Sequence, residues 1–151
     1  MRAFKGIALF ILCAALALSR PRPGNSAETN DWGVDFTKWH VHVVNGFGGQ
    51  RALEIHCKSD IDDLGTHTLT PGSDFNWHFR VNLPGTTRFS CDFHKDNQHA
   101  SFDVFWPESK DHWLRYRCNF KECFWIAKDD GIYIRNIPEG NRDEFFHGWE
   151  T

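Results

Sequence analysis

Short stretches in which apolar and polar residues alternate dominate this chain, and that period of two is typical of half-buried β-strands. The clearest run has apolar Phe75, Trp77, Phe79 and Val81 alternating with polar residues. Similar runs occupy residues 38–45, 53–58, 89–93, 102–106, 123–128 and 132–134. Turn-forming pairs such as Pro71-Gly72, Pro84-Gly85 and Asp130-Gly131 separate them, and no stretch of helical length keeps a 3.6-residue period. We therefore predict an all-β fold, a small antiparallel β-sandwich of seven to eight strands.

The cysteines indicate how such a sandwich is held together. Of five cysteines, Cys13 lies in an apolar N-terminal segment, and Cys57, Cys91, Cys118 and Cys123 remain. An even number in a small exported domain indicates disulfides, and four cysteines allow three connectivities. Cys57 and Cys91 each lie on the apolar side of their strand, whereas Cys118 and Cys123 are close in sequence. We therefore predict the disulfides Cys57–Cys91 and Cys118–Cys123, which would make the fold a two-disulfide sandwich.

The N-terminal segment predicts export. Arg2 and Lys5 precede an unbroken run of apolar and small residues from 6 to 18, the length of a secretory signal and too short for a membrane span. We predict a signal peptide over residues 1–27, with cleavage after residue 19 as an alternative. The mature domain would then be residues 28–151, and the expected localisation is secreted and extracellular.

Charge excludes several classes of partner. Loss of residues 1–27 removes four basic and no acidic residues, so the balance moves from 17 basic and 20 acidic to 13 and 20, a net charge of −7. Such an acidic domain, without a Lys/Arg cluster, has no electrostatic basis for binding phosphate backbones. We expect no nucleic acid partner and no membrane insertion, and partner surfaces that are neutral or basic.

Residues that could support catalysis or metal binding form no complete pattern. His40 and His42 share one strand face, and His56, His78, His94 and His99 are further candidates, but no third ligand has a diagnostic spacing. The cluster of Asp60, Asp62 and Asp63 lacks the glutamate that an EF-hand needs at loop position 12 and is interpreted as a capped turn. We therefore expect no metal, no cofactor and no enzymatic activity.

Several motifs are shared with a known family. They are residues 41–45, the block from Leu53 through His56-Cys57-Lys58-Ser59 to Gly65, residues 77–80 and 89–93, Cys118, residues 123–125 and residues 130–133. This pattern, covering about residues 38–136, resembles the plant self-incompatibility S-protein homologues of the poppy type. The resemblance implies a small secreted β-sandwich with two disulfides and no enzymatic activity. It also implies a ligand role, because poppy-type members are stigma-secreted ligands that a pollen receptor recognises.

A rigid scaffold without a catalytic site works through its exposed loops, which gives two candidate segments. These are the polar connections 94–99 and 108–112, with Lys95, Asp96, Asn97, Gln98, Lys110 and Asp111 as candidate receptor-binding residues. The expected partner is a cell-surface protein receptor, and the expected state is a monomer. The alternative is a secreted carbohydrate-binding, lectin-like module, for which exposed Trp32, Trp113 and Trp149 would be the sugar platform.

Overall fold

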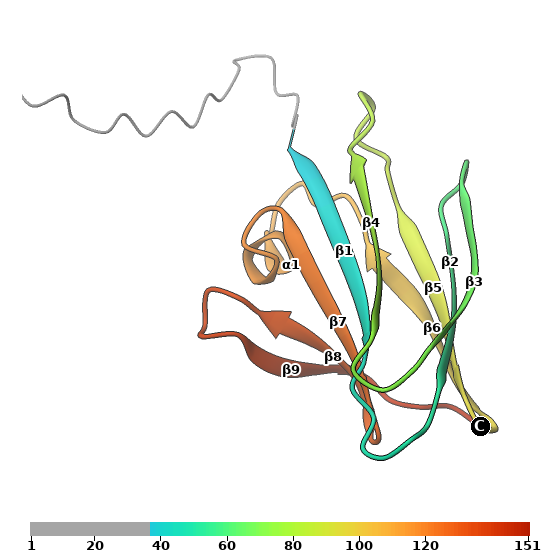
Figure 1. Ribbon diagram of the computed structural model, residues 1–151. Coiled ribbons are helices and arrows are strands. Elements are labelled where there is room, and N and C mark those ends of the chain that lie inside the picture. The colour runs from blue at the N-terminus through green and yellow to red at the C-terminus, as the bar shows by residue number, and fades with distance from the viewer. Residues whose placement is uncertain (1–36) are drawn as a thin grey trace, which may run out of the picture. The chain divides into compact units, whose positions relative to one another are not determined.

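The computed structural model describes residues 37–151; the predicted signal peptide and Trp32 lie outside them. Within this part of the chain, nine strands form two sheets, accompanied by one short helix (Figure 1). The first sheet has the order β4-β1-β7-β8-β9, with strands Asp74–Arg80, Lys38–Asn45, Glu122–Lys128, Gly131–Asn136 and Arg142–His147. The second has the order β3-β2-β5-β6, with strands Asp63–Leu69, Leu53–Lys58, Phe89–Lys95 and Gln98–Phe105. Helix α1 spans Trp113–Arg117.

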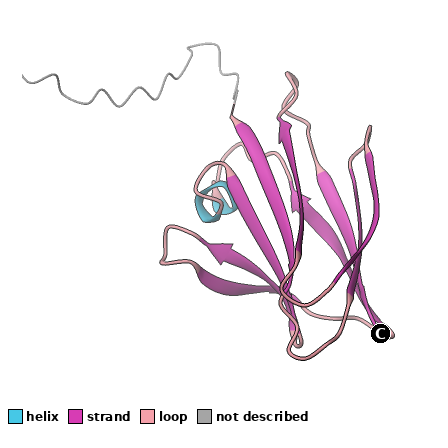
Figure 2. Ribbon diagram, in the orientation of Figure 1, coloured by secondary structure: helices cyan, strands magenta, loops and turns pink. Residues whose placement is uncertain are grey.

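The two sheets face each other and enclose one aromatic core (Figures 1 and 2). Trp125 of β7 is fully buried, and its indole Nε1 donates a hydrogen bond of 3.0 Å to the carbonyl of Val104 on β6 in the opposite sheet. Trp39 of β1 likewise crosses to the second sheet, with its ring 5.0 Å from that of Phe105. Because the inward positions carry the alternating apolar residues of the sequence, the predicted all-β sandwich is confirmed.

Every predicted strand is present, and the structure adds elements that the sequence does not reveal. Strands β3 and β9 lack a clear apolar alternation, and α1 has five residues, too few for a helical period. The described residues thus form nine strands where seven to eight are predicted. One pairing also differs from the prediction, because β1 and β7 run parallel at the centre of the first sheet. No helix within residues 37–151 is long and apolar enough to cross a membrane.

The disulfides have the predicted connectivity. Cys57 and Cys91 lie directly opposite each other on β2 and β5, with both side chains in the core. Cys118 and Cys123 close a short loop between α1 and β7. Asn119 and Phe120 in that loop have φ angles of 47° and 63°, so the disulfide encloses a tight left-handed turn. Both bridges therefore connect neighbouring elements that the hydrophobic core already brings together.

Candidate functional site

The two predicted recognition loops lie at opposite ends of the sandwich. The turn that contains Asp96 and Asn97 precedes β6, whereas the loop with Lys110 and Asp111 follows the other end of that strand. An eight-residue strand spans about 25 Å, so a compact interface cannot include both loops. Which of the two loops belongs to a recognition surface therefore depends on the residues that surround each loop.

Lys95 was predicted to be an exposed recognition residue, and this prediction is wrong. It ends β5 in phase with Phe89, Cys91 and Phe93, so its side chain points inward and is only 4% exposed. Its ammonium lies 4.6 Å from the ring of Trp149 and 5.4 Å from that of Phe47, and it donates a hydrogen bond to the carbonyl of Asp129. Burial lowers the pKa of Lys95. Its role is to hold the C-terminal segment against the core.

This role of Lys95 can be tested against an exposed lysine. We expect Lys95→Ala to lower the free energy of unfolding by about 1–3 kcal/mol, because it removes packing, two cation–π contacts and a hydrogen bond. Lys110→Ala, at an exposed loop position, should change it by less than about 0.5 kcal/mol. Urea denaturation of both variants measures the difference. Equal stability of the two variants would contradict the structural role.

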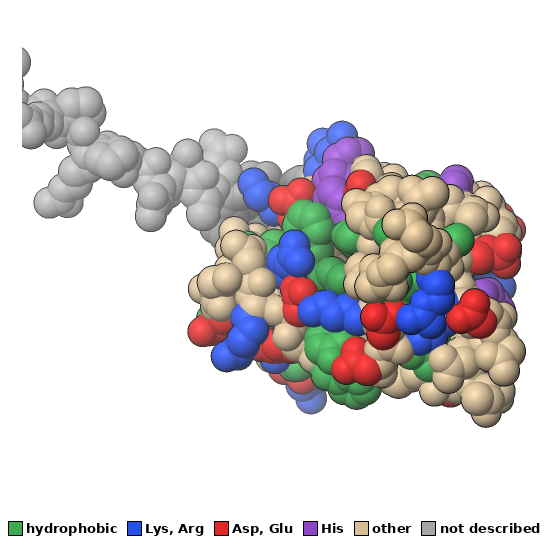
Figure 3. Space-filling view, turned by 60° about the horizontal axis from the view of Figure 1, so that its bottom comes forward, with side chains coloured by type: hydrophobic (Ala, Val, Ile, Leu, Met, Phe, Trp, Pro, Cys, Tyr) green, Lys and Arg blue, Asp and Glu red, His purple; other side chains and the backbone are tan. Residues whose placement is uncertain are grey.

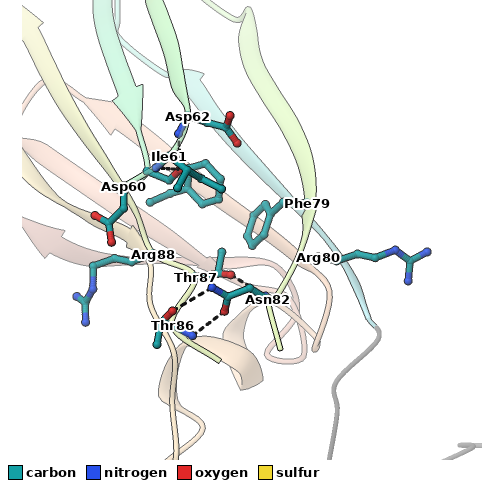
Figure 4. A pocket seen from close by; sticks show the side chains of 11 residues that line it. Asp60, Ile61, Asp62, Phe79, Arg80, Asn82, Thr86, Thr87 and Arg88 are labelled. Carbon is teal, nitrogen blue, oxygen red and sulfur yellow. Dashed lines mark hydrogen bonds between the residues drawn. The ribbon is translucent and has the colours of Figure 1, made fainter. Parts of the chain in front are cut away.

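A pocket lies at the end of the sandwich away from Lys95. The β2–β3 loop and the β4–β5 loop enclose it, and its volume is about 260 Å³ (Figure 4). Phe79 lies between the loops and continues into the core, with its ring 4.6 Å from Phe89 and 4.7 Å from Phe105. In Figure 4, Ile61 lies beside the pocket, and Arg80 and Asp60 point away from Phe79. The pocket is therefore apolar at its centre and charged at its rim.

Large apolar side chains are exposed around this pocket. Ile61 is 91% exposed, and Leu83, next to the pocket-lining Asn82, is 81% exposed. These are the two highest values among the exposed large hydrophobic residues of segment 37–151. Apolar residues inside a polar rim are typical of protein interfaces, where a few central anchors supply most of the binding energy. We call the β2–β3 loop (residues 59–62) and the β4–β5 loop (residues 81–88) together the loop end.

Hydrogen bonds hold both loops of the loop end in a defined conformation. The Ser59 hydroxyl accepts from the backbone N–H of Asp62 at 3.0 Å. The Asp63 carboxylate accepts from the backbone N–H of Gly65 at 2.8 Å, so the acidic segment forms the capped turn expected from the sequence. The Asn82 side chain contacts Thr86 twice, and the Asn82 N–H donates to the Thr87 hydroxyl at 2.8 Å. Ordered loops lose less conformational entropy on binding than mobile ones. The sequence shows the turns but not that they converge on Phe79.

The second predicted loop adjoins this surface. A further pocket is lined by residues of the β4–β5 loop together with Pro107 and Glu108. The Glu108 carboxylate accepts hydrogen bonds from the backbone N–H groups of Leu114 and Arg115, at 2.7 and 3.1 Å, and so caps α1. Lys110 and Asp111 between Glu108 and α1 are exposed. They extend the loop end, whereas Asp96, Asn97 and Gln98 lie at the opposite end.

Trp113 and Trp149, two of the tryptophans proposed as a sugar platform, are engaged in packing. Trp113 is partly buried against the core, with the guanidinium of Arg117 4.0 Å above its ring. Trp149 is also partly buried, and its indole Nε1 donates to the carbonyl of Lys128 at 2.9 Å. Neither presents a free flat ring, so these two residues give no support to the lectin-like alternative.

Charged side chains are mixed in sign on the face of the molecule drawn in Figure 3. In Figure 3, Lys and Arg side chains are interspersed with Asp and Glu. Several charged side chains form ion pairs, including Arg117 with Glu144 at 2.6 Å and Lys128 with Asp143 at 2.9 Å. Hydrogen bonds from Asn136 and Arg117 lower the pKa of Glu144 to about 2. This face offers no patch of one sign to attract a polyanion.

The six histidines considered as metal ligands divide between the two sheets. His56 lies on β2 and pairs with Asp63 at 2.7 Å, whereas His40, His42 and His78 lie together on the first sheet. No third ligand for His40 and His42 is evident from residue spacing, but the structure places Glu122 beside them. A hydrogen bond from His42 lowers the pKa of Asp74 on the neighbouring strand. Glu122 cannot be predicted as a ligand from sequence spacing, because it lies on β7 and is brought beside His40 only by the parallel pairing of β7 with β1.

The fold and the loop end together define a small disulfide-bonded β-sandwich with an ordered, partly apolar loop surface. The chain matches the family model described as plant self-incompatibility protein S1 over residues 40–149. It is 42% identical to S-protein homolog 1 of Arabidopsis thaliana, over 95% of this chain and 94% of that protein. It is 33% identical to self-incompatibility protein S1 of Papaver rhoeas, over 62% of this chain and 65% of that protein.

The chain belongs to the plant self-incompatibility S1 family. A solved structure supports the fold, with a TM-score of 0.59 and 21% identity over 77% of this chain and 97% of that one. It represents the self-incompatibility protein homologues, described as small, highly stable, secreted plant proteins. The family match extends to residue 149, beyond the 38–136 of the sequence resemblance, and so includes β9.

Proposed function

We propose that this chain is secreted and acts, as a monomer and without enzymatic activity, as an extracellular ligand for a protein receptor on plant cells. The observation that carries the proposal is the loop end, where Ile61 and Leu83 are exposed on hydrogen-bonded loops around an apolar pocket. Exposing two large aliphatic side chains to water is unfavourable, and covering them on binding recovers that free energy.

Charge and neighbouring loops support the same surface. Asp60 and Asp62 are exposed beside the apolar centre, and Lys110 and Asp111 are exposed in the adjoining loop, which matches a receptor surface that is neutral or basic with an aliphatic pocket. Asp96, Asn97 and Gln98, also candidates from the sequence, lie at the far end and would remain outside this interface. The proposal therefore assigns recognition to one end of the molecule.

Binding to plant plasma membranes tests the proposal. We expect labelled protein to bind saturably, and the double variant Ile61→Ala with Leu83→Ala to bind about 30-fold more weakly, the effect of losing a hot spot worth about 2 kcal/mol. Protease treatment of the membranes should abolish binding. Loss of binding on glycosidase treatment instead would favour the lectin-like alternative.

The matched control is Phe145→Ala, which removes another exposed large apolar side chain, 59% exposed on β9. It should bind like the wild type, because β9 lies at the edge of the first sheet and outside the loop end. If the double variant and the wild type bind equally, recognition does not use the loop end. Circular dichroism checks that each variant is folded.

A further inference from the structure

Three potential metal ligands meet on the outer face of the first sheet. They are His40 and His42 on β1 and Glu122 on β7, which the parallel register places directly beside His40. His42 Nε2 lies 3.2 Å from His40 Nδ1 and 3.2 Å from Glu122 Oε1, and His40 Nδ1 lies 3.6 Å from the same oxygen. Bonds of about 2.0–2.2 Å at the tetrahedral angle separate neighbouring zinc ligands by about 3.3–3.6 Å. The three atoms are therefore spaced like three corners of a zinc site.

The hydrogen bonds on the far side of each ring indicate which nitrogen is free to bind. His42 Nδ1 lies 2.9 Å from Asp74 Oδ2, and a carboxylate only accepts, so this nitrogen carries the proton. Asn76 Nδ2 donates to the same carboxylate at 2.9 Å, which turns Asn76 Oδ1 toward His40 Nε2, also at 2.9 Å. His40 Nε2 is then the donor, and the lone pairs of His40 Nδ1 and His42 Nε2 face Glu122.

Three acceptor atoms thus converge, and a cation between them would satisfy all three. A proton on one of the two nitrogens makes a hydrogen bond between one pair of these atoms, whereas a divalent metal ion can bond to all three atoms at once. The carboxylates of Glu122 and Asp74 together carry two negative charges, which match a divalent cation. Asp74 and Asn76 also supply the second hydrogen bond that metal-bound imidazoles make in proteins.

Neighbouring rings fix the two imidazoles in this arrangement. His40 stacks on His78 with ring centroids 3.8 Å apart, and His42 stacks on Phe124 at 4.3 Å with an interplanar angle of 12°. The side chains of His40, His42 and Glu122 remain 22%, 12% and 40% exposed, so water or a donor atom from a partner can reach a fourth position. Figure 3 shows several histidine side chains together on one part of the surface.

We propose that His40, His42 and Glu122 form a surface binding site for a divalent transition metal, best fitted by Zn²⁺. Two imidazole nitrogens and one carboxylate oxygen are ligands that zinc accepts in proteins, with the fourth position open. The proposal is independent of the receptor-binding loop end, since these ligands lie on the β1–β7 face. It revises the expectation from sequence that these histidines bind no metal.

Titration with Zn²⁺ tests the site. For this experiment the protein is produced by secretion from plant cells and purified without a histidine tag. A chelator removes any bound metal before isothermal titration calorimetry. We expect one Zn²⁺ per chain, bound with a Kd in the micromolar range or below. The variants His42→Ala and Glu122→Gln should each weaken binding by at least tenfold, and Asp74→Asn by about 10–100-fold through loss of ring orientation.

A matched control variant and a spectroscopic signature distinguish binding at this site from binding at other histidines. His94→Ala removes an exposed histidine from β5 of the other sheet and should leave Zn²⁺ affinity unchanged. Co²⁺, used as a probe, should give the intense visible absorption of tetrahedral coordination in the wild type and lose it in His42→Ala. A Kd weaker than about 100 µM, or equal loss of affinity in His94→Ala and His42→Ala, would overturn the proposal. Circular dichroism confirms that the compared variants are folded.

Discussion

Replacing Trp125 with alanine is expected to cost about 3–5 kcal/mol of unfolding free energy, enough to unfold a domain of marginal stability. The side chain is fully buried and contacts Phe102 and Phe146, with ring centroids 5.3 and 4.9 Å away. Its loss leaves a cavity between the sheets and leaves the Val104 carbonyl without its indole donor. Chemical denaturation followed by circular dichroism measures the effect.

Trp113→Ala is the matched control for Trp125→Ala. Trp113 is a partly buried tryptophan on α1 that packs at the edge of the same aromatic group. We expect its replacement to cost less than half as much, because the site can relax toward solvent and no bond between the sheets is lost. An equal or larger cost for Trp113→Ala would mean that stability does not centre on the contact between the two sheets.

Removing the Cys57–Cys91 disulfide is expected to cost about 3–4 kcal/mol, as in the double variant Cys57→Ala with Cys91→Ala. The bridge joins residues separated by 34 positions, and closing a loop of that length restricts the unfolded chain substantially. The Cys118–Cys123 bridge joins residues only five positions apart, so its loss should cost less, about 2 kcal/mol.

Denaturation of the two double-alanine variants under non-reducing conditions compares the bridges. The expected order follows from loop length, because all four cysteines are buried to the same degree, at 0–1% exposure. If removal of Cys118–Cys123 proved the more damaging, the tight turn through Asn119 and Phe120 would be the larger contribution, and the chain-entropy argument would be wrong for this protein.

Much of the fold follows from the sequence because inward-facing residues alternate so regularly. The prediction fails where packing at long range decides the outcome. Strand β9 has partly buried residues on both faces, and it forms through pairing with β8. The parallel pairing of β1 with β7 joins segments about 80 residues apart, and no local signal records it.

The candidate sites show the same division between local and long-range information. Lys95 is in phase with Phe89, Cys91 and Phe93, so the alternation continued to the end of the strand predicts an inward side chain at this position. The loop end and the group of His40, His42 and Glu122 form only because particular loops and strands lie side by side. Predicting either site therefore requires the order of strands in the sheets. Residue type alone does not place Ile61 beside Phe79.

Site-directed photo-crosslinking tests the assignment of recognition to the loop end most directly. A photoreactive side chain is placed at Ile61 in one protein and at Asn97, in the opposite turn, in another, and each is irradiated on plant plasma membranes. The proposal predicts a discrete receptor adduct from position 61, suppressed by excess unlabelled wild type, and little from position 97. The reverse pattern, with a suppressible adduct from 97 and none from 61, would contradict it.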